Sequence, residues 1–374
     1  MGIEAESVEQ KIEEYERELK ELSKTTERTS KLSEALKGSL QALPGVGLVA
    51  GITHEVFGLE GAVRSVIAQT TVFDTETRES FERVKQKLKK DIFEIKKATG
   101  AGFAEIEEKL VELIHQTGKY DESIKKAAIT ALQLERITRG KLEGQELTRA
   151  ITQLHKNLNV PIQEAADYIF AVYQKAGDKA GDLLDTFWEY SDALRDAGIT
   201  ARELSAILIA GAQAGAFNFD KIGDLLKEGF KASLVEASTL QEILGNIEKN
   251  QKGLIDTLFG EGSKEWAKLK SAFVDYVQGV QKGNKELAKV SFAKIAALLA
   301  EAYKKDAIKT KELIQKVFGS IGAEDVGIQV LEAISRGLAN PDEFLKGAKT
   351  IKQAYEEALS PIERFQIALT STFT

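Results

Sequence analysis

Apolar side chains in the first 43 residues recur with the alternating four-and-three spacing that defines a heptad seam. The seam residues are Val8, Ile12, Tyr15, Leu19 and Leu22. Side chains at such positions become buried when two or more helices pair. A polar interval of threonine and serine follows, after which the seam resumes. We therefore predict a coiled-coil helix over residues 1–43 that drives self-association. One amphipathic helix packed on its own chain is the alternative.

A run of small apolar residues follows Pro44, which ends the first predicted helix. The run covers residues 45–52 and is far shorter than the roughly 20 apolar residues of a membrane span. Its glycines approach the spacing of a nucleotide-binding turn, but such a turn needs a preceding strand, and here a helix precedes it. We interpret residues 44–80 as a glycine-rich apolar linker or helical segment in which the glycines permit close packing.

The rest of the chain has helical periodicity, with apolar residues three and four positions apart. Residues 81–143 form one predicted helical segment, and residues 144–374 form a bundle of short helices joined by short turns. Sustained alternation of apolar and polar residues, which is typical of a half-buried strand, does not occur in the sequence. The predicted fold class is therefore all-α, with an N-terminal coiled-coil helix followed by a multi-helix bundle.

The clearest core element lies in residues 198–230. Thr200 and Glu203 have the spacing of a capping box, just after Gly198. Residues 204–216 are then almost entirely apolar or small, which predicts a helix that is buried on all sides and includes Leu208. Asn218 is predicted to cap the amphipathic helix that follows. The stretch therefore predicts a helical hairpin in the core.

Composition limits the function classes. Hydrophobic residues make up 43% of the 374 residues and charged residues 29%, which is typical of a soluble, core-forming protein. The net charge of −7 disfavours a dedicated nucleic-acid binder. The absence of cysteine excludes disulfides and thiolate chemistry. Few prolines, one methionine and abundant Lys and Glu favour a thermophilic source.

The sequence offers no constellation typical of catalysis. The three histidines, His54, His115 and His155, have no spacing that would place two of them on one turn of a zinc-binding helix. Glu112 and His115 form a single Glu-x-x-His, whereas di-iron bundles need two such motifs and further carboxylates. Neither a phosphate-binding loop nor a nucleophile elbow is present. We predict no enzyme activity, no cofactor and no metal site.

The central stretch resembles the helical region of phage tail tape-measure proteins. Leu208 is the predicted core residue of this stretch. The residues that carry this first similarity are Gly198, Thr200, Glu203, residues 210–213 (which include Gly211 and Gln213), Gly215, residues 216–217, Asn218, Asp220 and Lys221. A second run matches at Phe318, Gly319, Glu324, Asp325 and Gly327, with Ser320 where the family usually has threonine. A third similarity spans residues 360–369. Together they cover roughly residues 144–374.

This resemblance implies a structural protein that occupies the lumen of the tail tube, templates tail length and assembly, and is ejected at infection. The implied partners are tail tube proteins, tail-tip or baseplate proteins and tail assembly chaperones, with host membrane contact on ejection and no specific nucleic acid. The implied locations are the virion tail and, during assembly, the host cytoplasm. A homo-oligomer through the N-terminal coil is expected from the heptad seam.

The length of the chain and two other classes of function leave alternatives to a tape-measure protein. Tape-measure proteins usually continue into further apolar helices and coiled coil, so we expect either an N-terminal part of a longer chain or a short relative. One rival is a helical scaffold or adaptor unrelated to phages, which gene neighbours would distinguish. The other is a membrane-active protein that conceals an apolar hairpin, which liposome leakage would reveal.

Overall fold

The computed structural model describes residues 46–216, 218–233, 237–318, 327–361 and 363. These residues form seventeen helices and no strand, which confirms the predicted all-α class. The predicted coiled-coil seam at residues 8–22 lies outside the described residues. Helix α2 (Val46–Gln69) is the first described element. None of the described helices has both the length and the apolarity needed to cross a membrane.

The chain divides into two compact units, Met1–Gly61 and Ala62–Thr374. The second unit begins within α2 and contains all later helices. The predicted segment borders at residues 80 and 143 stay predictions.

The second unit starts with three helices whose ends are set by local sequence: α3 (Arg78–Thr99), α4 (Phe103–Thr117) and α5 (Glu122–Ile137). Thr77 caps α3, and Gly100 and Gly118 end α3 and α4 in the left-handed conformation, with φ of 66° and 67°. Asp121 caps α5 through hydrogen bonds from two backbone amides.

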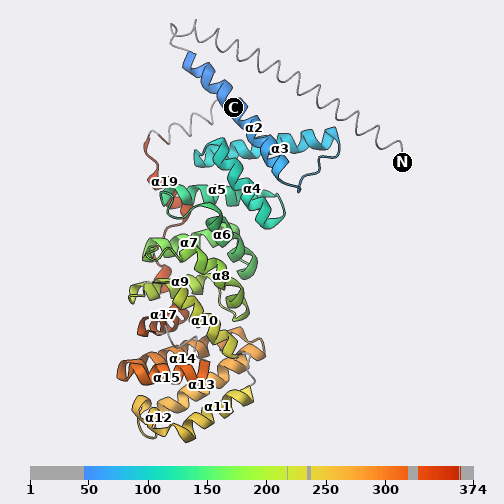
Figure 1. Ribbon diagram of the computed structural model, residues 1–374. Coiled ribbons are helices and arrows are strands. Elements are labelled where there is room, and N and C mark those ends of the chain that lie inside the picture. Colours follow the sequence, from blue (N-terminus) through green and yellow to red (C-terminus); the bar gives the residue numbers. More distant parts are fainter. Residues whose placement is uncertain (1–45, 217, 234–236, 319–326, 362, 364–374) are drawn as a thin grey trace, which may run out of the picture. The chain divides into compact units, whose positions relative to one another are not determined.

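The next five helices continue a stack in which each helix packs on the helix two positions along the chain. They are α6 (Gly144–Leu158), α7 (Ile162–Ala176), α8 (Leu183–Asp196), α9 (Ala201–Gln213) and α10 (Asp220–Ser233). One row runs through α4, α6, α8 and α10, and the other through α5, α7 and α9. Such stacking buries a continuous core between near neighbours, as in helical solenoids (Figure 1).

Five helices form the far end of the unit: α11 (Ala237–Asn250), α12 (Lys252–Phe259), α13 (Lys264–Gln281), α14 (Lys285–Lys305) and α15 (Ala307–Phe318). Helices α13 and α14 form a close hairpin. A Cβ on Gly279 would lie 2.6 Å from the backbone nitrogen of Ala288, so only glycine permits this approach.

The chain then turns back along the stack. Helix α17 (Ile328–Ala339) packs on both α14 and α9, α18 (Pro341–Leu345) packs on α9, and α19 (Ile351–Ala358) packs on α5 and α7. Figure 1 shows these red helices beside the green ones that precede them by more than a hundred residues. We call residues 327–361 and 363 the C-terminal strap. Sequence patterns did not predict this return.

Candidate functional site

Helix α9 is the most deeply buried element of the stretch that resembles tape-measure proteins. Every residue from Glu203 to Gly211 is buried, and Leu208 is fully buried. Helices α7, α10, α17 and α18 contact α9. The prediction of a buried helix over residues 204–216 is therefore confirmed for residues 204–211. It is wrong for the end of that stretch, because α9 ends at Gln213, and Gln213 and Gly215 are exposed.

Two glycines let neighbouring helices approach α9 closely. A Cβ on Gly337 of α17 would lie 2.6 Å from the Cα atom of Ile207, which is backbone and cannot move aside. A Cβ on Gly211 would lie 2.3 Å from Cδ1 of Ile222 and 3.3 Å from Cβ of Ala333. Gly211 belongs to the predicted motif, whereas Gly337 was missed. The available signal was a glycine inside an otherwise apolar helical pattern.

The start of α9 has the predicted capping box and a partner that the sequence did not reveal. Oγ1 of Thr200 accepts from the Glu203 amide at 3.2 Å, and Oε2 of Glu203 accepts from the Thr200 amide at 2.8 Å. The other oxygen of Glu203 lies 2.7 Å from Nζ of Lys289 in α14. Burial opposes the charge on Lys289, but Glu203 and Glu286 outweigh it and raise the pKa of the ammonium. The box thereby joins α9 to α14.

Gly198 turns the chain into this box. Its φ of +77° lies in the left-handed region, which glycine adopts without strain. A Cβ there would also lie 2.7 Å from Cβ of Lys285, so the position is closed to larger residues on two counts. Gly215, after α9, has a φ of +97°, and Gln213 beside it is exposed. The family motif thus marks both ends of α9.

The predicted cap at Asn218 is wrong. Helix α10 begins at Asp220, and Oδ2 of Asp182 accepts hydrogen bonds from the amides of Phe219 at 2.8 Å and Asp220 at 3.1 Å. Asp182 lies just before α8, and α8 packs on α10. The carboxylate of Asp182 therefore caps α10 from the start of another helix. A cap that comes from 37 residues earlier leaves no local sequence signal.

Polar contacts hold the α8–α10 interface. Oγ1 of Thr186 donates to Oδ1 of Asp220 at 3.0 Å, and the hydroxyl of Tyr190 donates to Oδ1 of Asp224 at 2.8 Å. Burial raises the pKa of Asp220, and neighbouring carboxylates, Asp182 among them, add to the shift. Lys221, which follows Asp220 in the motif, is exposed. Asp220 therefore contributes to the packing of α10 on α8.

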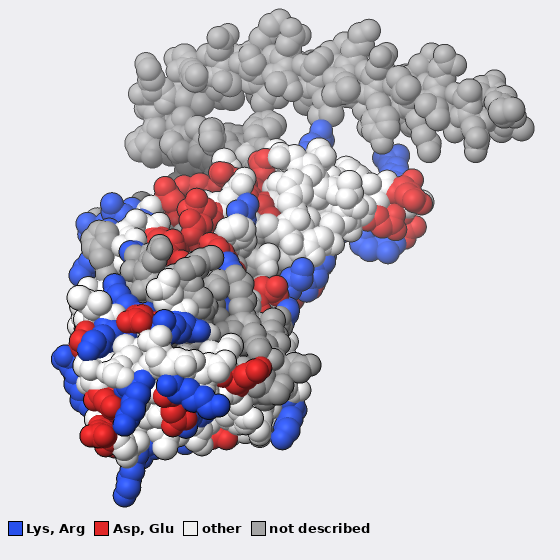
Figure 2. All heavy atoms as spheres, turned by 60° about the horizontal axis from the view of Figure 1, so that its bottom comes forward, with Lys and Arg blue, Asp and Glu red and all other residues white. Residues whose placement is uncertain are grey.

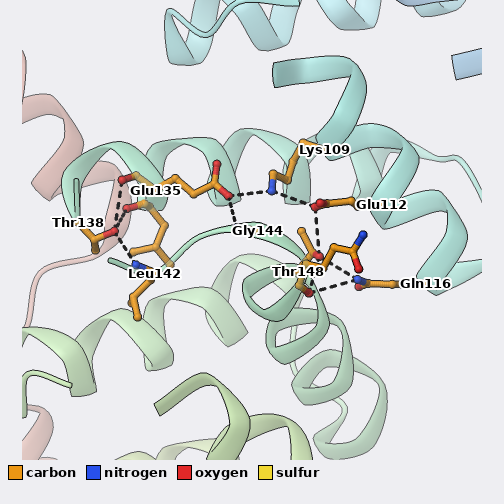
Figure 3. Close-up of polar contacts among 10 residues, drawn as sticks. Lys109, Glu112, Gln116, Glu135, Thr138, Leu142, Gly144 and Thr148 are labelled. Atoms are coloured by element: carbon orange, nitrogen blue, oxygen red, sulfur yellow. Dashed lines mark hydrogen bonds and ion pairs between the residues drawn. The ribbon is translucent and has the colours of Figure 1, made fainter. Parts of the chain in front are cut away.

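A buried ion-pair network joins α4, α5 and α6 (Figure 3). Nζ of Lys109 lies 3.0 Å from Glu112 and 2.8 Å from Glu135, and Lys109 is only 4% exposed. The Gly144 amide donates to Glu135 at 3.0 Å. Burial lowers the pKa of Lys109, but the two carboxylates outweigh that effect and the net shift is upward. The charged lysine therefore links three helices.

The two residues of the Glu-x-x-His pair have separate partners in the structure. Glu112 is engaged by Lys109, while Nε2 of His115 lies 2.8 Å from the carbonyl oxygen of Gln69 in α2. In the described part of the chain, no group of three or more His, Cys, Asp or Glu side chains has a metal-binding arrangement.

An open cavity of 680 Å³ lies beside Lys109, between the first turns of α4 and the end of α5. Its walls carry both signs of charge, including Glu105, Glu108, Arg136 and Arg139. Arg136 pairs with Glu363 of the C-terminal strap. It also donates to the carbonyl oxygen of Thr99, the last residue of α3, at 3.1 Å. The cavity wall therefore also anchors the end of the strap.

Charges of both signs also mix on the face of the molecule that Figure 2 shows. Figure 2 shows Lys and Arg side chains interleaved with Asp and Glu over the lower part of that view.

The second similarity run lies at a helix junction. Phe318 is the last residue of α15, and Gly327 directly precedes α17 with an extended backbone, φ −105° and ψ 164°. Gly319, Glu324 and Asp325 lie outside the described residues. The role predicted for this run stays a prediction.

A family model described as phage-related minor tail protein matches residues 86–319, which is more than half of the chain. The matched region extends from α3 through α15 and includes the whole run from Gly198 to Lys221. Neither the curated proteins nor the solved structures contain a match. The chain belongs to the family of phage-related minor tail proteins.

Proposed function

We propose that this protein is a tail tape-measure protein, which occupies the tail tube lumen and sets tail length during assembly. Membership of a minor tail protein family gives the chain a structural role in a phage tail, in contact with other tail proteins. The tape-measure role is a finer statement. The observation that carries it is the motif run from Gly198 to Lys221, which brackets the buried helix α9.

The described residues support a mechanical role over a chemical one. The motif residues cap helices, turn the chain or fill the core, and the charged groups at the α4–α6 junction neutralise one another. A tape-measure protein needs helices that present a defined length to polymerising tube subunits, and an α-helix rises about 1.5 Å per residue.

The proposal also assigns partners and locations. Tube subunits would polymerise around the chain, tail-tip or baseplate proteins would hold one end, and assembly chaperones would keep it competent in the host cytoplasm. In the virion the chain would lie in the tail lumen, and ejection would bring it to the host envelope. The heptad seam at residues 8–22 would pair copies of the chain.

Tail length provides the test. Six heptads of coiled-coil sequence inserted within residues 1–43 add 42 residues, which should lengthen tails by about 63 Å. Tail length is measured by electron microscopy over many particles, with a chain carrying the same insertion scrambled to break the heptads as a control for added mass. Tails of unchanged length would contradict the tape-measure role.

A further inference from the structure

The second unit begins and ends at the same place in the fold. At its start, Oγ of Ser65 in α2 donates to Glu107 in α4, and Nε2 of Gln69 donates to the same carboxylate at 3.1 Å. Both contacts fall in the first two turns of α4. The chain therefore enters the unit along α4, because Gln69 also contacts His115 in the last turn of that helix.

At its end, the C-terminal strap reaches the two helices that flank α4 in the sequence. Glu363 pairs with Arg136 of α5, and the buried Tyr355 donates to the carbonyl oxygen of Thr99. Thr99 is the last residue of α3, four residues before α4 begins at Phe103. Arg136 also lines the cavity formed in part by Glu105 and Glu108 of α4. The chain thus leaves the unit beside α3 and α5, which both pack on α4.

The return is fixed along its length. Nζ of Lys175 donates to the Lys346 carbonyl at 2.9 Å, and the amide of Lys349 donates to Gln174 at 2.9 Å. The Ile351 amide donates to Oδ1 of Asp167 at 2.7 Å, and the side chain of Ile351 is buried. The strap is therefore held on α7 before it reaches α5.

Because of this topology, two residues that are far apart in the sequence lie close together in space. A single helix over residues 65–363 would span about 450 Å. In the folded unit Ser65 adjoins α4 and Glu363 adjoins α5, which packs on α4, so their separation is on the order of 20 Å. A folded unit of this kind adds almost nothing to the end-to-end length of a chain that passes through it.

We propose that residues 62–363 are a length-neutral module: they stay folded in the tail, and tail length is set by segments outside them. This inference rests on the tape-measure role proposed above. The module then holds and docks the chain in the assembled tail, and extended segments outside the module set the tail length.

An insertion of the same length at a second position tests the length-neutral module separately from the tape-measure role. The 42 residues used in the 1–43 insertion are placed instead between Glu261 and Gly262, in the exposed turn after α12, where Gly262 has a φ of +65°. Exposed turns tolerate such insertions. If the module is length-neutral, tail length is unchanged for this variant and longer by about 63 Å for the 1–43 insertion. Equal lengthening in both variants overturns the length-neutral module. No lengthening in either variant overturns the tape-measure role, and the inference with it.

A distance measurement covers the case in which the insertion blocks assembly. The natural chain has no cysteine, so Arg64→Cys with Lys352→Cys creates a unique pair of labelling sites. Both positions are exposed. Energy transfer between the two dyes should be the same in the free protein and in purified tails. Its loss in tails would show an extended unit, because a helix over 288 residues would separate the dyes by about 430 Å.

Discussion

Single residues without side chains set how closely the helices of the second unit approach each other. Gly337 lets α17 lie against the backbone of Ile207 in α9, and Gly279 does the same for α13 and α14. The Gly337 contact sets the spacing of two helices that are distant in sequence, and the Gly279 contact sets the spacing within one hairpin. A glycine in a helix costs stability locally, and here close packing offsets that cost.

Gly337→Ala should destabilise the protein by about 2 kcal/mol, because the new methyl group would meet backbone atoms that cannot give way. The matched control is Gly245→Ala in α11, where a Cβ would have no heavy atom within 4 Å. There the higher helix propensity of alanine should stabilise the protein by about 0.5–1 kcal/mol. Denaturant unfolding of both variants measures the difference. Equal effects would show that α17 does not approach α9 this closely.

The charge on Lys109 holds α4 and α5 together at a buried position. Lys109→Ala leaves Glu112 and Glu135 without their cation, so we expect a loss of about 3–5 kcal/mol. Lys90→Ala is the control, since its contact with Glu94 is exposed and 3.9 Å long, and its removal should cost less than about 0.5 kcal/mol. Chemical denaturation compares the two. Similar small losses would mean that water enters the network.

Among the elements, helical periodicity predicted that the chain forms helices and missed their long-range partners. The limits of α4 lie at Gly102 and Gly118, so local signals of this kind allow its ends to be predicted. The cap of α10 could not be predicted, because it comes from Asp182 across a helix pair. The strap could not be predicted either. Its anchors pair Glu363 with Arg136 and Tyr355 with Thr99, and pairs so far apart have no periodic signature.

The end of the strap should loosen in acid. Hydrogen bonds from Ser360, together with the Arg136 ion pair, lower the pKa of Glu363 to about 2. A carboxyl group whose folded pKa is depressed stabilises the fold above its unfolded pKa of about 4.3, and this contribution is lost as pH falls from there toward 2. The melting temperature of Glu363→Gln should therefore lie below that of the natural protein at pH 7. The gap should close in the acidic range. A gap that widens in acid would refute this assignment.

At the scale of the whole molecule, the candidate site was only partly predictable. The sequence predicted the buried helix and its capping box because both are local. It did not reveal that the unit closes on itself, which depends on contacts of the C-terminal strap with the end of α3 and with α5. The division at Gly61 separates the heptad region from this closed unit.

The N-terminal region should drive self-association through its heptad seam. An isolated amphipathic helix of this length is marginal in water, and pairing of apolar seams offsets the entropy of ordering it. Ile12→Asp with Leu19→Asp should reduce the mass measured by light scattering to that of a monomer. The matched control exchanges the residues outside the seam, Lys11→Asp with Lys20→Asp. A monomer at all concentrations in the natural protein would refute the pairing.

We propose that this minor tail protein lies inside the tail tube, and protease treatment of purified, intact tails tests this location. The fragments are followed by an antibody to residues 62–363. A chain inside the tube should stay uncut in closed tails and be cut once the tubes are opened. Cleavage in closed tails at the same rate as in opened ones would place the chain on the outside and refute the proposed location.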